Sequence, residues 1–188
     1  DSLRPLFNRP LMAMYPPGSI FKVANALVGL QERIITPNTL YGCAGGFMRN
    51  KGRPRCHLHS SPLAVSDAIQ TSCNAFFAGM YVDMLHNAKY DSISGAFNQW
   101  RSYIDLFGIG RMLHVDVPSE KAGRLPTTQL YNKWYGRNRW KGMTIVSNSI
   151  GQGEVLMTPL QMANTACVIA NGGFYIEPHF FKSFYNEA

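Results

Sequence analysis

Apolar residues recur every three or four positions in three parts of the chain, which is the spacing of a helix that buries one face. The first predicted helix begins at Ser19, after the helix-breaking run Pro16-Pro17-Gly18, and ends before Thr36-Pro37-Asn38. Its expected buried stripe consists of Phe21, Ala24, Leu27, Val28 and Leu30. A serine therefore stands at the start of the first helix.

The second predicted helical region begins at Ser61-Pro62, where an N-cap residue precedes a proline at the first helical position. It is interrupted near Ser72 and continues to about Leu85. The apolar face expected for its second half consists of Phe76, Phe77, Met80, Tyr81 and Met84. The interruption predicts a tight connection between two helices.

The third predicted helix has sequence signals at both ends. Thr158-Pro159-Leu160-Gln161 has the pattern of a capping box with a proline in the first turn, and Asn171-Gly172-Gly173 is typical of a helix stop. We therefore expect a helix over residues 159–170, with Cys167 as a small core residue. Residues 94–107 predict one further short helix, and residues 174–184 are expected to be extended.

Length and composition fit one globular domain or most of one, because the chain has 188 residues, of which 46% are hydrophobic. The chain has no apolar run of membrane-spanning length. Its first residues lack the pattern of a signal peptide, and it begins without Met, which suggests processing or a piece of a longer protein.

Lysine and arginine outnumber aspartate and glutamate by 18 to 11, which gives a net charge of +7. The cations are densest in residues 133–141, where they alternate with aromatic residues. Such a segment can stack on bases or bind another polymer, but it is also typical of a polar loop or hairpin that its tryptophans anchor. Because no nucleic-acid-binding motif accompanies it, we expect no nucleic-acid partner.

Ser19 and Lys22 lie three residues apart at the start of the first predicted helix, so their side chains project from one face. A serine hydroxyl becomes a good nucleophile when a neighbouring base accepts its proton, and a lysine serves as that base when burial lowers its pKa. The same spacing is also typical of an N-cap serine followed by a solvated lysine. The two residues are candidates for a nucleophile and its base.

Ser72 and Asn74 form a second candidate pair, in the predicted connection between two helices. Side chains at alternate positions of a tight turn can face one cleft, where the serine relays a proton and the amide holds a substrate carbonyl. The alternative is that one of them simply caps the helix that follows.

The sequences around both pairs closely resemble those of penicillin-binding proteins. Residues 15–22 are similar to the active-serine motif of that family, and residues 68–77 are similar to its second motif. Residues 149–153 and 158–163 resemble the segment before the third motif. The basic aromatic stretch of residues 131–142 narrows the resemblance to the elongation-type class B enzymes called penicillin-binding protein 2.

This resemblance implies an α+β fold of the serine D,D-peptidase/β-lactamase-like transpeptidase type, of which the chain is mainly the α-helical lobe without most of the flanking antiparallel sheet. It implies peptidoglycan D,D-transpeptidase activity in the full-length protein, through an acyl-serine and without a catalytic cofactor. The implied catalytic residues are Ser19 as the acylated nucleophile, Lys22 as its base, Ser72 as the proton relay and Asn74 as the holder of the substrate amide. The implied substrate-binding segment is Gly151-Gln152-Gly153.

The implied partners are peptidoglycan stem peptides, β-lactam antibiotics and a membrane glycosyltransferase of the elongation machinery. The implied location is the periplasmic face of the bacterial inner membrane. Two alternatives remain open: a β-lactam sensor or other non-catalytic penicillin-binding domain, and a serine β-lactamase, which Gly151-Gln152-Gly153 and Thr158-Pro159 disfavour.

The third motif of the family, Lys-Ser/Thr-Gly, is absent, because Lys182-Ser183 is followed by Phe184. Its expected place is beyond Ala188, so we expect residues 1–188 to be one partial domain that is truncated at both ends. We expect this polypeptide alone to be inactive, since loss of one oxyanion donor already costs about 10²–10³ in rate.

Cys43, Cys56, His57 and His59 cluster in a segment rich in glycine and arginine before the second motif. Cysteine and histidine at such spacing can bind structural zinc, with Cys73 or another group as the fourth ligand. A Cys43–Cys56 disulfide is a second interpretation, and unpaired small residues are a third.

Overall fold

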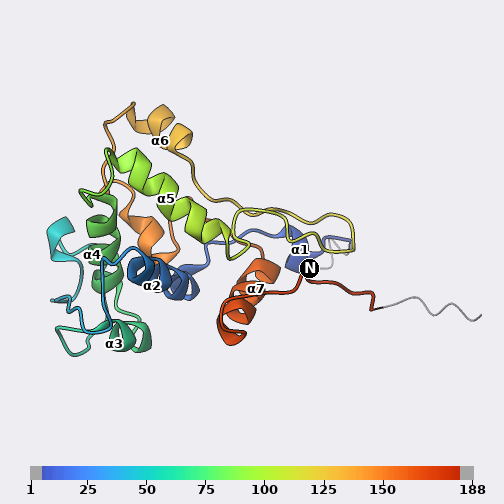
Figure 1. Ribbon diagram of the computed structural model, residues 1–188, viewed down its shortest axis with the longest axis horizontal. Helices are drawn as coiled ribbons and strands as arrows, with labels where there is room; N and C mark the ends of the chain where they lie inside the picture. Colours follow the sequence, from blue (N-terminus) through green and yellow to red (C-terminus); the bar gives the residue numbers. More distant parts are fainter. Residues whose placement is uncertain (1–5, 183–188) are drawn as a thin grey trace, which may run out of the picture.

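The computed structural model describes residues 6–182, which are built mainly of helices (Figure 1). The α-helices are α1 (Arg9–Met12), α2 (Phe21–Gln31), α3 (Val65–Gln70), α4 (Asn74–Leu85), α5 (Ile93–Asp105), α6 (Thr128–Tyr135) and α7 (Pro159–Ala170). The 3₁₀ turns are η1 (Gly18–Ile20), η2 (Met48–Asn50) and η3 (Val146–Ile150).

Pairing between extended segments in residues 6–182 is limited to isolated β-bridges. This agrees with the prediction that the chain is mainly the helical lobe of an α+β fold. No helix in the described range has the length and apolar character needed to cross a membrane. The prediction that Lys182-Ser183-Phe184 is not the third family motif also depends on Ser183 and Phe184, which lie outside the described residues.

Helix α4 is the centre of the fold, because it lies between two apolar clusters. Tyr81 faces the first cluster and contacts Trp100 of α5 edge to face, with ring centroids 5.3 Å apart. Phe77 and Met80 belong to the second cluster, on the side of α3. A helix that is apolar all round is a buried helix, so the predicted single face was too narrow a description.

Helix α2 carries most of the stripe that was predicted for it. Phe21, Ala24 and Val28 are buried, but Leu27 is 43% exposed, which corrects the prediction for that residue. Leu27 lines an open apolar hollow between α2, α5 and α7, so its side of the helix is not covered by residues 6–182.

The second helical region starts later than predicted. Ser61-Pro62 precedes helix α3 instead of beginning it, because Leu63 pairs with Tyr41 through two backbone hydrogen bonds of 3.0 Å. A residue in an extended bridge cannot belong to a first helical turn. The predicted interruption is confirmed, since α3 ends at Gln70 and α4 begins at Asn74.

Helix α7 has the bounds and the capping box that were predicted for it. Cys167, however, is exposed, which corrects its assignment to the core. The helix instead turns polar residues inward, and Gln161 donates through Nε2 to the carbonyls of Arg111 and Ala122, both at 2.8 Å. The buried face of α7 therefore fixes loops through hydrogen bonds.

The short helix expected over residues 94–107 is confirmed as α5, whereas α6 was not expected as a helix. Helix α6 ends at Gly136, whose φ of 90° is accessible mainly to glycine. Trp140 is buried and anchors the turn that follows, as the interpretation of an anchored loop requires. Trp134 lies on the helix and is 49% exposed.

Candidate functional site

The turn between α3 and α4 presents two side chains to the start of α2. Ser72 has a left-handed backbone, with φ of 52°. Cys73 is the N-cap of α4 and accepts a hydrogen bond from the Phe76 amide at 3.4 Å. Since neither Ser72 nor Asn74 is the cap, the capping alternative is wrong, and both side chains are available to the site.

Lys22 is buried, with 2% exposure, and its Nζ meets three oxygen atoms of this turn. The acceptors are the Ser72 carbonyl at 2.7 Å, Ser72 Oγ at 2.9 Å and Asn74 Oδ1 at 2.6 Å. An ammonium group has three N–H donors, so these acceptors satisfy the protonated lysine completely. The solvated-lysine alternative is therefore wrong.

Ser19 lies at the mouth of this buried site. Its Oγ is 2.9 Å from Ser72 Oγ, so the hydrogen-bonded path from Ser19 to Lys22 runs through the Ser72 hydroxyl. Ser19 is exposed, whereas Lys22 is buried. A substrate can thus reach the hydroxyl of Ser19 while the proposed base stays shielded from water.

Burial shifts the proton equilibrium of Lys22 toward its neutral form. Burial lowers the pKa of Lys22 below its usual value of 10.5, and the thiols of Cys56 and Cys73 partly oppose this shift. A neutral lysine has a lone pair that can accept a proton, which is the state that a general base needs.

The segment Gly151-Gln152-Gly153 borders the start of α2. The amide of Gly18 donates to the Gly151 carbonyl at 2.9 Å. Gly151 has φ of 67°, and a side chain there would overlap the Gly18 carbonyl. Glycine is therefore required for this close approach. Gln152 is exposed beside Gly18, next to the proposed nucleophile Ser19.

Asn25 positions the site, a role that the sequence pattern did not predict. It is 1% exposed and donates through Nδ2 to the Ser149 carbonyl at 2.8 Å, while its Oδ1 accepts from Trp100 Nε1 at 2.8 Å. It thereby joins α2 to the segment that leads into residues 151–153. An amide inside the apolar stripe of a predicted helix is the signal that could have revealed it.

Four potential metal ligands converge behind the same turn. One ligand atom from each of Cys43, Cys56, His59 and Cys73 lies within 4.8 Å of the others, and the Sγ atoms of Cys56 and Cys73 are 4.0 Å apart. Sulfur atoms bound to one tetrahedral zinc, each about 2.3 Å from the metal, lie at a similar separation. His57 is not among the four, and its ring packs edge-on against the ring of His59.

The orientation of His59 suits a metal ligand. Its Nδ1 lies 2.6 Å from the Ser60 carbonyl, and its Nε2 is buried without a hydrogen-bond partner. A histidine that donates through one ring nitrogen presents the other as a ligand. The cysteines carry free thiols, so the Cys43–Cys56 disulfide interpretation does not describe this structure.

The ligand cluster and the candidate catalytic turn share residues and hydrogen bonds. Cys73 stands between Ser72 and Asn74, and burial raises the pKa of its thiol to about 12. The Arg55 carbonyl accepts from Asn74 Nδ2 at 2.7 Å, and Cys56 Sγ accepts from the Ala75 amide at 3.2 Å. The geometry of one site therefore depends on the other.

The family model described as the penicillin-binding protein transpeptidase domain matches residues 1–187. The chain belongs to this family. The predicted family and fold are thereby confirmed, and the buried lysine, the two serines and the asparagine lie in the part of the chain that resembles the first two motifs of penicillin-binding proteins.

Curated relatives of this transpeptidase domain are named peptidoglycan D,D-transpeptidase MrdA. The chain is 32% identical to the protein of Acinetobacter baumannii over 187 residues, which cover 96% of the chain and 26% of that relative. It is 27% identical to the protein of Escherichia coli K12, covering 97% of the chain and 28% of that relative. The chain thus spans little more than a quarter of the length of these relatives.

Solved structures show the same fold. The chain is 26% identical in sequence to Pseudomonas aeruginosa PBP2, whose crystal structure matches it with a TM-score of 0.81. The match covers 97% of this chain and 40% of that one. The complex of Helicobacter pylori PBP2 with MreC is 27% identical with a TM-score of 0.77, over 96% of this chain and 32% of that one. The narrowing of the family to penicillin-binding protein 2 is in agreement with these neighbours.

Proposed function

We propose that the full-length protein is a peptidoglycan D,D-transpeptidase in which Ser19 is the acylated nucleophile. The observation that carries this proposal is the continuous path from exposed Ser19 through Ser72 to buried Lys22. The names of the curated relatives support the substrate class, which is the D-Ala-D-Ala end of peptidoglycan stem peptides.

The contacts suggest how the proton moves. When Lys22 is neutral, it keeps two N–H donors for the Ser72 carbonyl and Asn74 Oδ1, and its lone pair can accept from Ser72 Oγ. Ser19 Oγ bonds to the carbonyl carbon of the penultimate D-Ala, its proton passes to Ser72, and the proton of Ser72 passes to Lys22. The peptide C–N bond then breaks, and the departing D-Ala nitrogen takes the proton from Lys22 by the same path.

The second half of the reaction reverses the first. An amine of a neighbouring stem peptide attacks the acyl carbon, and its proton passes into the relay. The bond between the acyl carbon and Ser19 Oγ then breaks, and the relay returns a proton to Ser19 to restore the hydroxyl. In the structure, Asn74 uses Oδ1 for Lys22 and Nδ2 for the Arg55 carbonyl. Because the Asn74 Nδ2 group has two N–H donors and Arg55 uses one, the second could donate to a substrate carbonyl as predicted.

The direct test is mass spectrometry of the full-length protein after reaction with a penicillin, with Ser19→Ala as the control. The proposal requires one covalent adduct that maps to Ser19 and is absent from Ser19→Ala. An adduct on another residue would overturn the assignment of the nucleophile. Rapid turnover of nitrocefin would indicate a β-lactamase, and an adduct without crosslinking of stem peptides would indicate a sensor.

We propose that the full-length protein works with a membrane glycosyltransferase of the elongation machinery, at the periplasmic face of the inner membrane. Two solved neighbours support a complex of this kind. One is described as a complex between PBP2 and MreC, and the other is titled as a peptidoglycan synthase complex that coordinates polymerization and crosslinking. Co-purification of the full-length protein with such a glycosyltransferase from membranes tests this partner.

We also propose that the four-ligand cluster binds a structural zinc ion. Cys43, Cys56 and Cys73 would supply thiolates and His59 would supply Nε2, which is buried and has no other partner. A bound zinc would hold the thiols deprotonated and fix the loop to the turn that carries Ser72. Catalysis itself needs no cofactor in this proposal.

Metal analysis of protein purified without chelator tests the zinc site directly. We expect about one zinc per chain and a large loss of zinc in Cys73→Ser. The control Cys167→Ser should lose none, because Cys167 is exposed and is not one of the four ligands. A zinc-to-protein ratio near zero in the unaltered protein would remove the proposal.

A further inference from the structure

Helix α6 and the turn after it form a strongly cationic surface. No aspartate or glutamate occurs from residue 121 to residue 153. Lys133, Arg137, Arg139 and Lys141 are all exposed, and within residues 6–182 none of them forms an ion pair with a carboxylate. These four cations are therefore available to an external anion. They are called the α6 cations below.

Two aromatic rings are exposed beside the α6 cations. Trp134 is 49% exposed and Tyr135 is 42% exposed. The fold does not need these exposed faces, because Tyr131 and Trp140 of the same segment already fill the core. Exposed aromatic rings offer apolar faces to a ligand, and unpaired cations attract an anionic one.

This surface is held in a fixed shape. The Gly136 amide donates to the Asn132 carbonyl at 2.9 Å, and the Arg139 amide donates to the Gly136 carbonyl at 3.1 Å. Trp140 is tied to the same helix, because its Nε1 donates to Asn132 Oδ1 at 2.8 Å. The α6 cations thus stand on an ordered turn, which lowers the entropy cost of binding.

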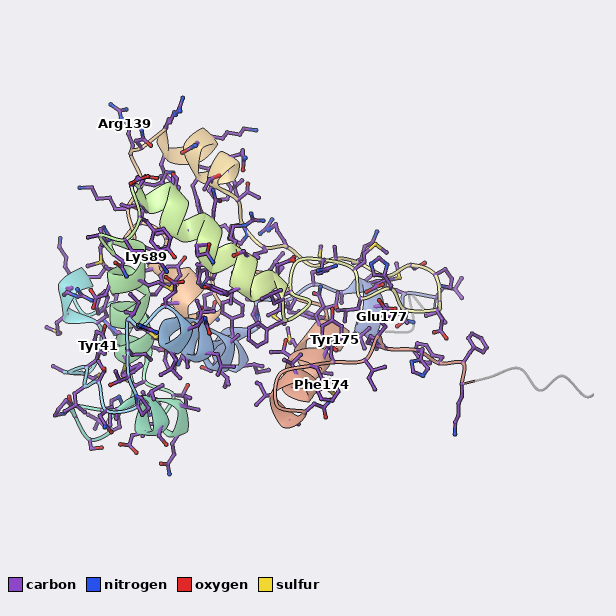
Figure 2. The ribbon with its side chains drawn as sticks, in the orientation of Figure 1. Tyr41, Lys89, Arg139, Phe174, Tyr175 and Glu177 are labelled. Atoms are coloured by element: carbon purple, nitrogen blue, oxygen red, sulfur yellow. The ribbon has the colours of Figure 1, made fainter. Side chains whose placement is uncertain are left out.

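The surface is separate from the candidate active site. Helix α6 packs on α5, whereas the candidate active site lies between the start of α2 and the turn that joins α3 to α4. Figure 1 shows α6 above α5, and α2 and α3 below it. Figure 2 shows Arg139 at the outer edge of this region, with its side chain pointing away from the body of the chain. A ligand on this surface therefore does not need to occupy the site around Ser19.

We propose that this surface binds a peptidoglycan strand at a distance from its reacting stem peptide. Sugar rings have apolar C–H faces that can stack on Trp134 and Tyr135, and free carboxylates of stem peptides complement the α6 cations. The surface would hold the polymer while one stem peptide enters the active site, which raises its effective concentration there. The identity of the polymer rests on the proposed function.

The test compares two charge-matched double variants of the full-length protein. Arg137→Gln with Arg139→Gln removes two α6 cations. Arg33→Asn with Lys182→Gln removes two exposed cations elsewhere, and asparagine suits the left-handed backbone at Arg33, where φ is 55°. Binding is measured by co-sedimentation with purified peptidoglycan and, separately, with vesicles of anionic phospholipid.

We expect the α6 double variant to bind peptidoglycan about fivefold to tenfold more weakly, as the loss of two exposed charge contacts predicts. The control double variant should bind like the unaltered protein. Trp134→Ala, like the α6 double variant, should bind more weakly than the unaltered protein. Added salt should weaken the binding of every variant. Equal binding by both double variants would overturn the proposal. So would binding to anionic vesicles without binding to peptidoglycan, which would assign the surface to the membrane.

Penicillin labelling of Ser19 separates this proposal from the proposed function. If the α6 double variant is labelled by penicillin at the normal rate and loses only polymer binding, both proposals stand. If the unaltered protein binds peptidoglycan but Ser19 is never labelled, the transpeptidase proposal fails while the binding surface stands.

Discussion

Replacing Ser72 by alanine or glycine separates the chemistry of the relay from the shape of its turn. Either change removes the hydroxyl that lies 2.9 Å from both Ser19 Oγ and Lys22 Nζ. Because the proposed proton path runs through this hydroxyl, we expect acylation by a penicillin to slow by about 10²–10⁴, the usual contribution of positioned proton transfer. Lys22 keeps its other two acceptors, so it should stay in place.

Ser72→Gly should be more stable than Ser72→Ala, although both variants lose the same acylation rate. The backbone at Ser72 is left-handed, and a residue with a Cβ pays about 1–2 kcal/mol for that conformation. The hydroxyl of serine offsets part of this through its hydrogen bonds, each with a net contribution of about 0.5–1.5 kcal/mol. Alanine loses these bonds and keeps the strain, whereas glycine loses the bonds and the strain together.

The assay is the second-order rate constant for labelling of the full-length protein by a fluorescent penicillin, measured beside thermal unfolding. Thr71→Val is the matched control, because its hydroxyl donates to the Asp67 carbonyl at 2.7 Å and takes no part in the relay. The control should keep a rate within about twofold. If Ser72→Gly reacted as fast as the unaltered protein, Lys22 would receive the proton by another route and the relay would be refuted.

Three further predictions concern the surroundings of the relay. The acylation rate should rise with pH as Lys22 loses its proton, with a midpoint below pH 10.5, since burial lowers the pKa of Lys22 from that value. A rate that falls over this range would contradict its role as a base. Asn25→Leu removes the hydrogen bonds of the amide to the Ser149 carbonyl and to Trp100 Nε1, both of which are buried, so urea unfolding should show a loss of about 2–6 kcal/mol. A loss below about 0.5 kcal/mol would contradict the structure. Gly151→Ala should destabilise the fold and slow labelling more than Gly172→Ala. Both glycines have positive φ, but only at Gly151 do other atoms occupy the space of the new Cβ. Equal effects of the two changes would refute the close approach of Gly151 to Gly18.

The sequence predicted helix α7 well because its capping box, first-turn proline and terminal glycines act locally. It failed at Ser61-Pro62, where the pairing of Leu63 with Tyr41, far along the chain, overrides a local start signal. Cys167 was misplaced for a similar reason, since the burial of one face of α7 depends on polar loops that no periodicity reveals.

The candidate site shows the same division. The resemblance to penicillin-binding proteins predicted that Ser19, Lys22, Ser72 and Asn74 would come together, and the hydrogen bonds agree with that expectation. Spacing alone could not select His59 over His57 in the ligand cluster, because that choice depends on the path of the loop between η2 and α3. Nor could it identify Asn25, whose partners lie more than 70 residues away.

The left-handed turn at Ser72 gives three consecutive side chains three different roles. Ser72 joins the relay, Cys73 caps α4 and joins the ligand cluster, and Asn74 contacts Lys22. An inserted or deleted residue at this point would exchange these roles among the side chains. Sequence drift in this domain should therefore leave the spacing of residues 72–74 unchanged.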